Sequence, residues 1–328
     1  MTRRHFVFLT AAAATATLPA GPARAVITLP RNLCFTGEDA FHRLTAKAIR
    51  DRWGKLPMPA RMITIARELE GVPYVGFTLE IHDRIECPSV HFHALDCWTF
   101  FETVLALARM IETPREQYTW TDLLAEIEWT RYRGGSCTGH YLERIHYLDE
   151  WFFDNAARRN VVDLTRSLPG ARPLRGRRST EMTDLWKSYR YLRENPHLRA
   201  PMRASEIEVE KLPVWFIPKA DVPAIEPRLQ NGDIIGIVTR TQGVVCSHVG
   251  LATRDPQGTL RFMHASRNHR KVVTDSRLSV YLDRFQAHAG IIAARPLDAR
   301  LALRDRPRYL ERLRQLKAGH RLSDADTR

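Results

Sequence analysis

The spacing of apolar residues changes part-way along the chain, and this change constrains the fold more than any other feature. Helical spacing predicts two helices within residues 38–70 and further helices at 95–111, 114–130 and 140–159. From Ile207 onward, short apolar runs predict strands at 207–217, 233–239, 247–254, 259–264 and 290–295. Because helices precede strands that are joined by tight turns, we expect an α+β fold with an antiparallel sheet.

The chain is long enough to form one compact domain. Its 328 residues are 44% hydrophobic and 27% charged, a composition that supplies a core and excludes a disordered or fibrous protein. We expect one domain over residues 26–296, with an exposed Arg-rich loop at about 166–178 and a basic helical tail at 297–328. A loop that leads into a short strand is expected after Gly71.

The first 25 residues have the three parts of a secretory signal peptide. Arg3 and Arg4 are followed by a short Ala-rich apolar stretch and an Ala-x-Ala cleavage pattern at residues 23–25. The paired arginines and Phe6 resemble a twin-arginine signal, which predicts export to a bacterial periplasm. A retained membrane anchor is the alternative, but the apolar run is short for a membrane span, and we expect no stable anchor.

The net charge of +13 is compatible with nucleic acid, an anionic membrane surface or an acidic polymer as partner. The sequence contains no stripe of basic residues interleaved with aromatic ones, so we do not expect nucleic acid binding. A generally basic surface is the simpler interpretation of the charge.

The five cysteines are too few for a disulfide framework, and their odd number leaves at least one thiol free within a single chain. Cys97 lies at the first turn of the expected helix at 95–111, where free N–H groups and the helix dipole favour a thiolate. The thiolate is the nucleophilic form, so Cys97 is a candidate nucleophile; an inert buried thiol is the alternative. Cys246 stands two residues before His248 and is expected on the same strand face, while the states of Cys34, Cys87, Cys137 and Cys246 are left open.

A metal site is a second interpretation of the region around Cys97. Cys87, His91, His93 and Cys97 supply two thiols and two imidazoles, a ligand set that suits Zn²⁺. The spacing is not that of a common zinc finger, and such a site would be structural. We therefore expect no metal or other cofactor in the reaction, and the zinc content of the purified protein would decide between the two interpretations.

Two histidines are expected to project from one face of a β-hairpin. His248 and His264 lie in strands on either side of the turn at residues 255–258. If Asp255 pairs with Thr259, both imidazoles lie on the same face, one diagonal step apart. The two histidines are then either catalytic or ordinary hydrogen-bonded polar residues.

Cys97, His248 and His264 together match the requirements of nucleophilic catalysis. Cys97 would attack a carbonyl carbon, His248 would accept and later return the proton, and His264 would orient His248. The backbone N–H of Cys97 is a ready donor to an oxyanion. The signatures of α/β-hydrolases, P-loop proteins, zinc metalloproteases and dinucleotide-binding proteins are absent from the sequence.

Five short motifs, in this order along the chain, resemble the NlpC/P60 cysteine peptidase superfamily. They are Gly71-Val72-Pro73-Tyr74-Val75-Gly76, Asp96-Cys97-Trp98-Thr99, Gly232-Asp233-Ile234-Ile235, Ser247-His248-Val249-Gly250 and His264-Ala265-Ser266. Residues 73–80, 96–102 and 141–147 more narrowly resemble the DUF1460 branch of N-acetylmuramoyl-L-alanine amidase-like proteins. Many superfamily members have a small residue and a serine after the Asp-Cys pair, whereas Trp98 and Thr99 follow it here.

The resemblance implies a papain-like fold, with N-terminal helices and the nucleophile helix packed on an antiparallel sheet. It implies hydrolysis of the amide bond between the N-acetylmuramoyl lactyl group and L-Ala, with muropeptides or peptidoglycan as partners. It assigns Cys97 as nucleophile, His248 as base and His264 as the third member, and it places Tyr74 beside the nucleophile, where it would help to hold the oxyanion. The residues expected to contact substrate are Arg131, Tyr132, Arg133, Tyr141, Arg144, His146, Tyr147 and Ser247.

Two alternative functions are open at this point. The first is an endopeptidase of the same fold that cleaves the γ-D-glutamyl-diaminopimelate bond. The second is a non-catalytic cell-wall binding protein that uses its basic surface and a substrate groove. The Cys/His/His set favours an enzyme, because a binding protein has no need of a thiol that faces two histidines.

Overall fold

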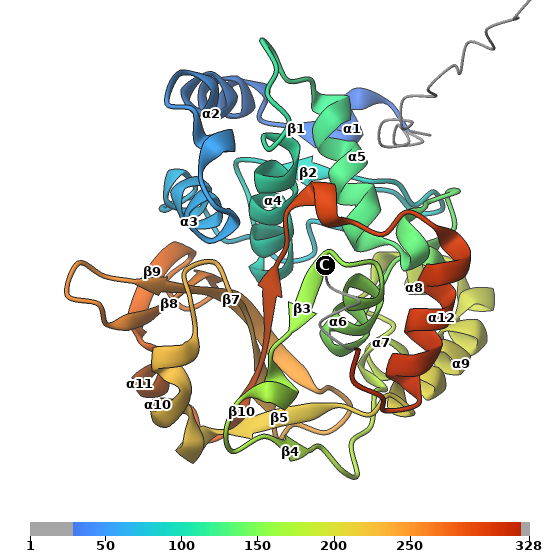
Figure 1. Cartoon of the computed structure of the whole chain (residues 1–328). Helices are drawn as coiled ribbons and strands as arrows, with labels where there is room; N and C mark the ends of the chain where they lie inside the picture. The colour runs from blue at the N-terminus through green and yellow to red at the C-terminus, as the bar shows by residue number, and fades with distance from the viewer. Residues whose placement is uncertain (1–28, 323–328) are drawn as a thin grey trace, which may run out of the picture.

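The computed structural model describes residues 29–322 and has the expected α+β architecture, with helices arranged around an antiparallel sheet (Figure 1). The signal peptide expected at residues 1–25 lies outside the described residues. Within residues 29–322, no helix is long and apolar enough to cross a membrane.

The main sheet has eight strands, and a separate pair lies near the N-terminus. The strands are β1 (Phe35–Thr36), β2 (Val90–His91), β3 (Val161–Asp163), β4 (Arg172–Pro173), β5 (Trp215–Pro218), β6 (Ile234–Thr239), β7 (Cys246–Arg254), β8 (Leu260–Ser266), β9 (Lys271–Arg277) and β10 (His288–Pro296). The main sheet has the order β4-β5-β10-β6-β7-β8-β9, and β3 pairs with β10. Its pairings are antiparallel, whereas β1 and β2 pair in parallel.

The helices surround this sheet in three groups. They are α1 (Arg31–Cys34), α2 (Glu38–Arg50), α3 (Met58–Glu68), α4 (Cys97–Met110), α5 (Trp120–Arg131), α6 (Leu148–Ala157), α7 (Glu181–Asp184), α8 (Arg190–Glu194), α9 (Arg199–Glu210), α10 (Val222–Ile225), α11 (Leu278–Asp283) and α12 (Arg306–Lys317). In Figure 1, α1 to α5 lie in the upper part, α6 to α9 and α12 gather at the right, and α10 and α11 lie at the lower left.

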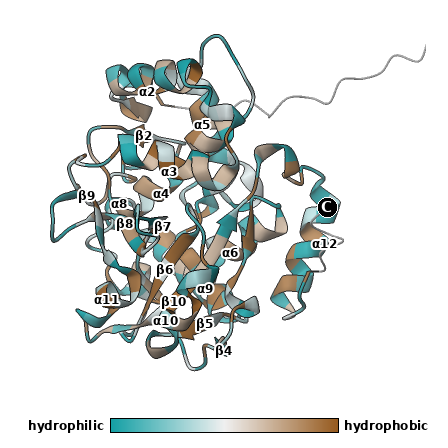
Figure 2. Ribbon diagram, turned by 60° about the vertical axis from the view of Figure 1, so that its left-hand side comes forward, coloured by the Kyte–Doolittle hydropathy of each residue, from teal (hydrophilic) through white to brown (hydrophobic). Residues whose placement is uncertain are grey.

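The central strands are buried on both faces. In β6, Ile234 and Val238 belong to the core cluster that contains α4, whereas Ile235 and Ile237 belong to a cluster with α10 and α11. Successive side chains of a strand point to opposite faces, so a strand covered on both sides must be apolar throughout. This requirement explains the continuous apolar run in β6, and Figure 2 shows the central strands in brown.

Helix α4 is buried from Thr99 to Met110, as its wide apolar face predicts. Asp96 is its N-cap: Oδ1 of Asp96 accepts a hydrogen bond from the backbone N–H of Thr99 at 2.7 Å. The Thr99 hydroxyl accepts one from the backbone N–H of Asp96 at 2.9 Å, which completes a capping box. The cap fixes Cys97 as the first residue of the helix.

Several predicted helices begin at other positions than expected. Helix α5 begins at Trp120 and not near Pro114, because Thr119 and Asp122 form a capping box there. In the segment 140–159, a short 3₁₀ turn precedes α6, which begins only at Leu148.

The strand predictions need three corrections. The segment 207–217 is divided between the end of α9 and β5, because Met202 and Val209 are buried at helical spacing and draw the first part into a helix. Strand β9 was not expected, because this edge strand is largely polar. The strand expected after Gly71 is reduced to isolated bridges, from Pro73 to Lys271 and from Tyr74 to Leu95.

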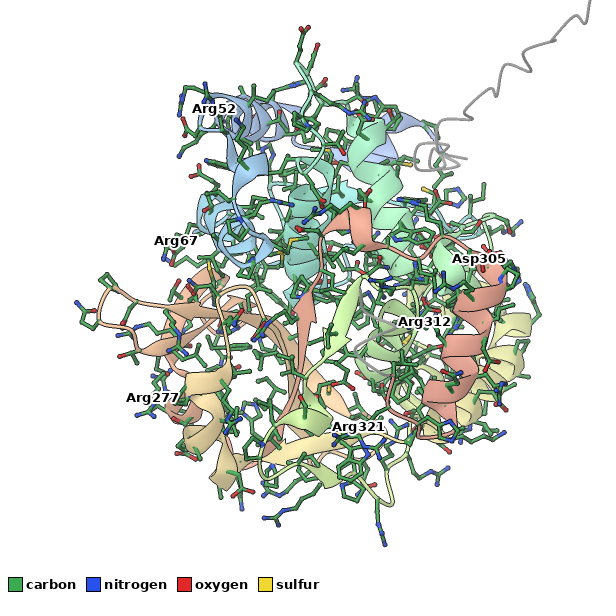
Figure 3. The ribbon with its side chains drawn as sticks, viewed as in Figure 1. Arg52, Arg67, Arg277, Asp305, Arg312 and Arg321 are labelled. Atoms are coloured by element: carbon green, nitrogen blue, oxygen red, sulfur yellow. The ribbon has the colours of Figure 1, made fainter. Side chains whose placement is uncertain are left out.

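The helix predicted after residue 296 is present as α12, and it packs against α6. The Tyr309 hydroxyl donates a hydrogen bond to Asp154 at 2.7 Å. Nε of Arg312, which is labelled in Figure 3, donates to the Ala157 carbonyl at 3.0 Å. Tyr309 is only 7% exposed, so this helix is part of the packed structure.

We expect Tyr309→Ala to lower the free energy of unfolding by about 3 kcal/mol, because it removes a buried ring and leaves Asp154 without one partner. Leu310→Ala in the same helix is the matched control, since Leu310 is 48% exposed and should change stability by less than about 0.5 kcal/mol. Denaturant unfolding of the full chain measures both values. Equal effects of the two substitutions would contradict the packing of α12.

Candidate active site

A cleft of about 330 Å³ opens at the N-terminus of α4. Its lining combines aromatic, charged and thiol side chains, among them Tyr74, Phe77, Glu80, Cys97, Trp98, Arg144, His146, Tyr147, Met182, Tyr189, Cys246 and Arg267. A smaller cavity of about 220 Å³ beside α6, α9 and α12 contains neither a cysteine nor a histidine. The larger cleft is therefore the candidate site.

The Cys97 thiol has a higher pKa than its position at a helix N-terminus predicts. Burial raises the pKa of Cys97 to about 12, and the negative charge of Asp96 adds to this effect. Hydrogen bonds from backbone N–H groups, the strongest from Val249, lower the pKa of Cys97, but they do not outweigh the effect of burial. The expectation of a favoured thiolate is thus corrected: burial of the thiol, with the nearby charge of Asp96, outweighs the attraction of the helix N-terminus for a negative group.

The two histidines meet as the hairpin register predicts. Arg254 pairs with Leu260, and the N–H of Asp255 donates to the Thr259 carbonyl at 3.1 Å. Nε2 of His248 lies 2.6 Å from Nδ1 of His264, so the two rings share a hydrogen bond. The predicted same-face arrangement is confirmed.

Gly250 makes this contact possible. It lies across from His264, and a Cβ atom at position 250 would stand 2.8 Å from the Cβ of His264 and 2.6 Å from the Met263 carbonyl oxygen. Any side chain at this position would push the two strands apart. The glycine of the Ser-His-Val-Gly motif is therefore a packing requirement of the histidine pair.

The pairing of β7 with β8 ends at Leu251 and Met263, so the two strands separate toward Val249. The Cys97 thiol lies where they separate. The backbone N–H of Ala252 bonds to Asp233 beside β6, so by alternation the N–H of Val249 points toward β8. There it approaches the sulfur of Cys97. The nucleophile candidate thus contacts the residue that follows His248.

A β-bulge separates Cys246 from the histidine pair. Ile237 pairs with His248 and Val238 with Cys246, so Ser247 is an extra residue in β7. The Cys246 side chain lines the cleft, whereas the ring of His248 packs near Phe262 and Tyr281. The expectation that Cys246 and His248 share a face is wrong, because the bulge shifts the alternation by one residue.

The histidine pair has an acidic neighbour that the sequence did not indicate. Oδ2 of Asp275, in β9, lies 3.6 Å from Nε2 of His264, and Arg284 holds the other carboxylate oxygen at 2.7 Å. Its contact with His264, together with the charge of Arg284, holds the pKa of Asp275 well below its usual range. The ionised Asp275 favours a proton on Nε2 of His264. With that tautomer, Nδ1 of His264 accepts from Nε2–H of His248, and Nδ1 of His248 carries no proton.

Both histidines are neutral at pH 7. Burial lowers the pKa of His248 well below its ordinary value, and the neighbouring imidazoles of His264 and His288 add to the effect. Burial also lowers the pKa of His264, although Asp275 opposes this. The Cys97 thiol and both imidazoles are therefore uncharged at neutral pH.

Tyr74 lines the cleft near Cys97, as the resemblance implies. Its backbone N–H donates to the Arg270 carbonyl at 2.9 Å, which ties this segment to the start of β9. Burial raises the pKa of Tyr74 to about 12, and negative charge at Cys97 and Asp96 adds to the effect. The phenol stays protonated at neutral pH and can donate a hydrogen bond into the cleft.

The residues expected to contact substrate divide into two groups. Arg144, His146 and Tyr147 line the cleft. The others do not line it: Arg131, Tyr132 and Tyr141 are buried in the fold, Arg133 lines the smaller cavity, and Ser247 is exposed in the bulge, where substrate contact stays a prediction.

Buried acids hold these side chains in place. Nε of Arg131 donates to Glu102 at 2.7 Å, and the Tyr132 hydroxyl donates to Glu86 at 2.7 Å. Glu80 accepts from Arg144 at 2.6 Å and from the Tyr141 hydroxyl at 3.1 Å. The segment 131–147 therefore builds the wall of the cleft more than it presents free cations to it.

Two cleft features were missed by sequence reasoning. Phe77 adopts a left-handed conformation with φ of 62° and is 57% exposed, with its ring 5.9 Å from that of Tyr189. Strained positions of this kind cluster at functional sites. Arg267 lines the cleft and has no ion pair with any residue of the described chain. An aromatic pair and a free cation thus face the same space.

The zinc interpretation finds no support in residues 29–322. The sulfur of Cys87 contacts that of Cys34, and Nε2 of His93 lies 3.2 Å from Asp39. No group of three or more His, Cys, Asp or Glu side chains in this part of the chain has a metal-binding arrangement.

The Cys97 thiol lines the cleft, whereas His248 and His264 lie on β7 and β8 beside it and are not among its lining residues. The chain belongs to the AmiA-like family of N-acetylmuramoyl-L-alanine amidase-like proteins, whose family model matches residues 64–291. No curated protein matches the chain significantly.

Solved structures resemble this chain over most of its length. An N-acetylmuramoyl-L-alanine amidase from Bacteroides uniformis is 28% identical, with a TM-score of 0.65 over 73% of this chain and 98% of its own. A Bacteroides fragilis protein described as a candidate xylanase is 30% identical, with a TM-score of 0.61 over 70% and 98% of the two chains. A Legionella pneumophila protein of the DUF1460 family is 21% identical, with a TM-score of 0.59 over 80% and 99%, and shares the fold.

The raised pKa of Cys97 predicts how its alkylation depends on pH. Because only the thiolate reacts, the rate with iodoacetamide should rise by about tenfold per pH unit from pH 6 to pH 9 without a plateau. Mass spectrometry of the peptide that contains Cys97 measures the rate, and the peptide of Cys246 is the internal control. A fast reaction that is already constant at pH 5–6 would show a thiolate-imidazolium pair instead.

The structural role of Arg131 predicts a large loss of stability on its removal. Arg131→Ala leaves Glu102 fully buried without its ion-pair partner and should cost about 3–5 kcal/mol of unfolding free energy. Arg133→Ala is the matched control, because the Arg133 side chain is 28% exposed and its loss should cost less than about 2 kcal/mol. Unchanged stability of the Arg131 variant would contradict the structural role and would favour the predicted contact of Arg131 with substrate.

Proposed function

We propose that this protein is an exported cysteine amidase that hydrolyses the amide bond between the N-acetylmuramoyl lactyl group and L-Ala in peptidoglycan fragments. The observation that carries the proposal is the Cys97 thiol at the start of α4, next to β7, which bears His248, the hydrogen-bond partner of His264 in β8. Membership of the AmiA-like family and the similarity to the Bacteroides uniformis amidase support the choice of bond.

In the first half of the reaction, Cys97 forms an acyl-enzyme. Nδ1 of His248 accepts the thiol proton as the sulfur attacks the lactyl carbonyl carbon. The carbonyl oxygen becomes an oxyanion, which accepts hydrogen bonds from the backbone N–H of Cys97 and from the Tyr74 hydroxyl. The C–N bond then breaks, His248 returns the proton to the amino group of L-Ala, and the stem peptide leaves.

In the second half, water releases the lactyl group. His248 accepts a proton from water, and the oxygen attacks the thioester carbonyl carbon. The C–S bond breaks, the lactyl carboxyl is formed, and the proton returns to the sulfur of Cys97. Asp275 and His264 keep the proton of His248 on Nε2 throughout, so Nδ1 accepts the proton in both halves.

The cleft has groups that suit both parts of a muropeptide. The Phe77–Tyr189 edge offers an apolar surface to the pyranose ring of the amino sugar. The guanidinium of Arg267 suits a carboxylate of the stem peptide, because it has no ion pair within the described chain. Charge complementarity between a basic protein and acidic stem peptides supports the same substrate class.

The proposed substrate is consistent with an exported protein and with the NlpC/P60 superfamily. Intact peptidoglycan lies outside the cytoplasm, and a twin-arginine-type signal at residues 1–25 would carry the folded protein into the periplasm. The helix-borne cysteine, the strand-borne histidines and the shared motifs support a papain-like fold of the NlpC/P60 superfamily. This architecture needs no cofactor for amide hydrolysis.

Product analysis on defined muropeptides tests the proposal. The full chain should release a peptide that begins with L-Ala, together with the free N-acetylmuramic acid sugar, as measured by liquid chromatography and mass spectrometry. Release of a fragment that begins with diaminopimelate would instead show a γ-D-glutamyl-diaminopimelate endopeptidase. Binding without any cleavage would show a non-catalytic cell-wall protein.

Three variants connect the activity to the site. Cys97→Ala should abolish cleavage, and His248→Ala should lower kcat/KM by about 10²- to 10⁴-fold, because general base assistance is lost. Cys246→Ser is the matched control, since it changes a second thiol in the same cleft and should retain most of the activity. Circular dichroism checks that each variant is folded. Activity retained in the Cys97→Ala variant would overturn the nucleophile assignment.

A further inference from the structure

Two cysteines far from the cleft have their sulfur atoms 3.0 Å apart. Cys34 ends α1 and is fully buried, and Cys87 precedes β2 and is 1% exposed. Two carbon atoms in optimal van der Waals contact are about 3.5–4.0 Å apart, and a sulfur atom is larger than a carbon atom. The distance between the two sulfurs is therefore shorter than a van der Waals contact. The parallel pairing of Phe35 with Val90 holds the two segments side by side.

We propose that Cys34 and Cys87 form a structural disulfide once the protein is in an oxidising compartment. The proposal rests on the export proposed above but not on the amidase activity. The disulfide would close a loop between positions 53 residues apart in the sequence. It would join the first described helix to the segment that leads into the nucleophile helix.

The bond forms by thiol-disulfide exchange with a small-molecule or protein disulfide, RS–SR. The Cys34 sulfur attacks one sulfur of the oxidant, the S–S bond of the oxidant breaks, and the first RSH leaves. The Cys87 sulfur then attacks the mixed disulfide at Cys34, and the second RSH leaves. Two protons and two electrons pass from the protein thiols to the oxidant.

The local contacts favour Cys34 as the first attacking thiol. Its pKa is lowered by the hydrogen bond from Cys87, whereas the pKa of Cys87 is raised by the same contact and by burial. Cys34 also lies in a four-residue helix at the start of the described chain. Because the helix is short and lies outside the main sheet, its local opening would be the route by which the buried sulfur meets the oxidant.

The other thiols have different surroundings. Cys137 contacts the Glu86 carbonyl at 3.6 Å, and both Cys97 and Cys246 line the cleft. Within residues 29–322, the Cys34–Cys87 pair is the one whose sulfur atoms are in contact. Pairing of these two cysteines leaves the Cys97 thiol free to react.

Disulfide mapping tests the proposal without any assay of activity. The full chain is purified from the periplasm, or refolded with glutathione disulfide, and is alkylated under denaturing, non-reducing conditions. Peptide mass spectrometry should find the Cys34 and Cys87 peptides linked, and Cys97, Cys137 and Cys246 alkylated. Reduction should then lower the Tm by roughly 5–15 °C.

Two variants complete the test. Cys34→Ala/Cys87→Ala should remove the response of the Tm to reductant, and Cys137→Ser should keep both the linked peptide and that response. Alkylation of all five cysteines after exposure to glutathione disulfide would overturn the proposal. A Cys87–Cys137 linkage would also overturn it. Neither result would affect the product analysis, so failure of the disulfide and failure of the amidase proposal are distinguishable.

Discussion

The capping of helix α4 by Asp96 fixes the position of the Cys97 sulfur, and the rest of the candidate site is arranged around that point. The helix is buried over most of its length, so its N-terminus can neither slide nor fray without loss of core packing. Its first residue meets β7 where the pairing with β8 ends, and the backbone of Val249 there approaches the sulfur. Core packing thus sets the geometry of the candidate nucleophile.

The same burial determines the resting chemistry of the site. It raises the pKa of Cys97 and lowers that of His248, so both groups are neutral before reaction. Asp275 acts from β9 through His264, and its charge selects the tautomer that leaves one nitrogen of His248 free. Buried ion pairs such as Arg131–Glu102 form the support behind the cleft, since a charge without a partner at such depth would be very costly.

Local patterns in the sequence were enough to predict α4 and the histidine hairpin. The wide apolar face of the segment 95–111 requires a buried helix, and the turn at residues 255–258 fixes the register that brings His248 and His264 together. The bulge at Ser247 was not predictable, because its cause lies in the pairing of β7 with β6. Strand β9 was also missed, and with it Asp275, because polar edge strands have no apolar period.

The sequence by itself determined the α+β class, the cysteine at a helix start, the paired histidines and the resemblance to peptidoglycan amidases. These features depend on residues that are close in sequence or on patterns with a fixed period. Only the tertiary structure decided which arginines are free and which are paired, where Asp275 stands and how Cys34 meets Cys87. Such contacts join segments that are far apart in the chain, and their energies depend on burial, which no local pattern records.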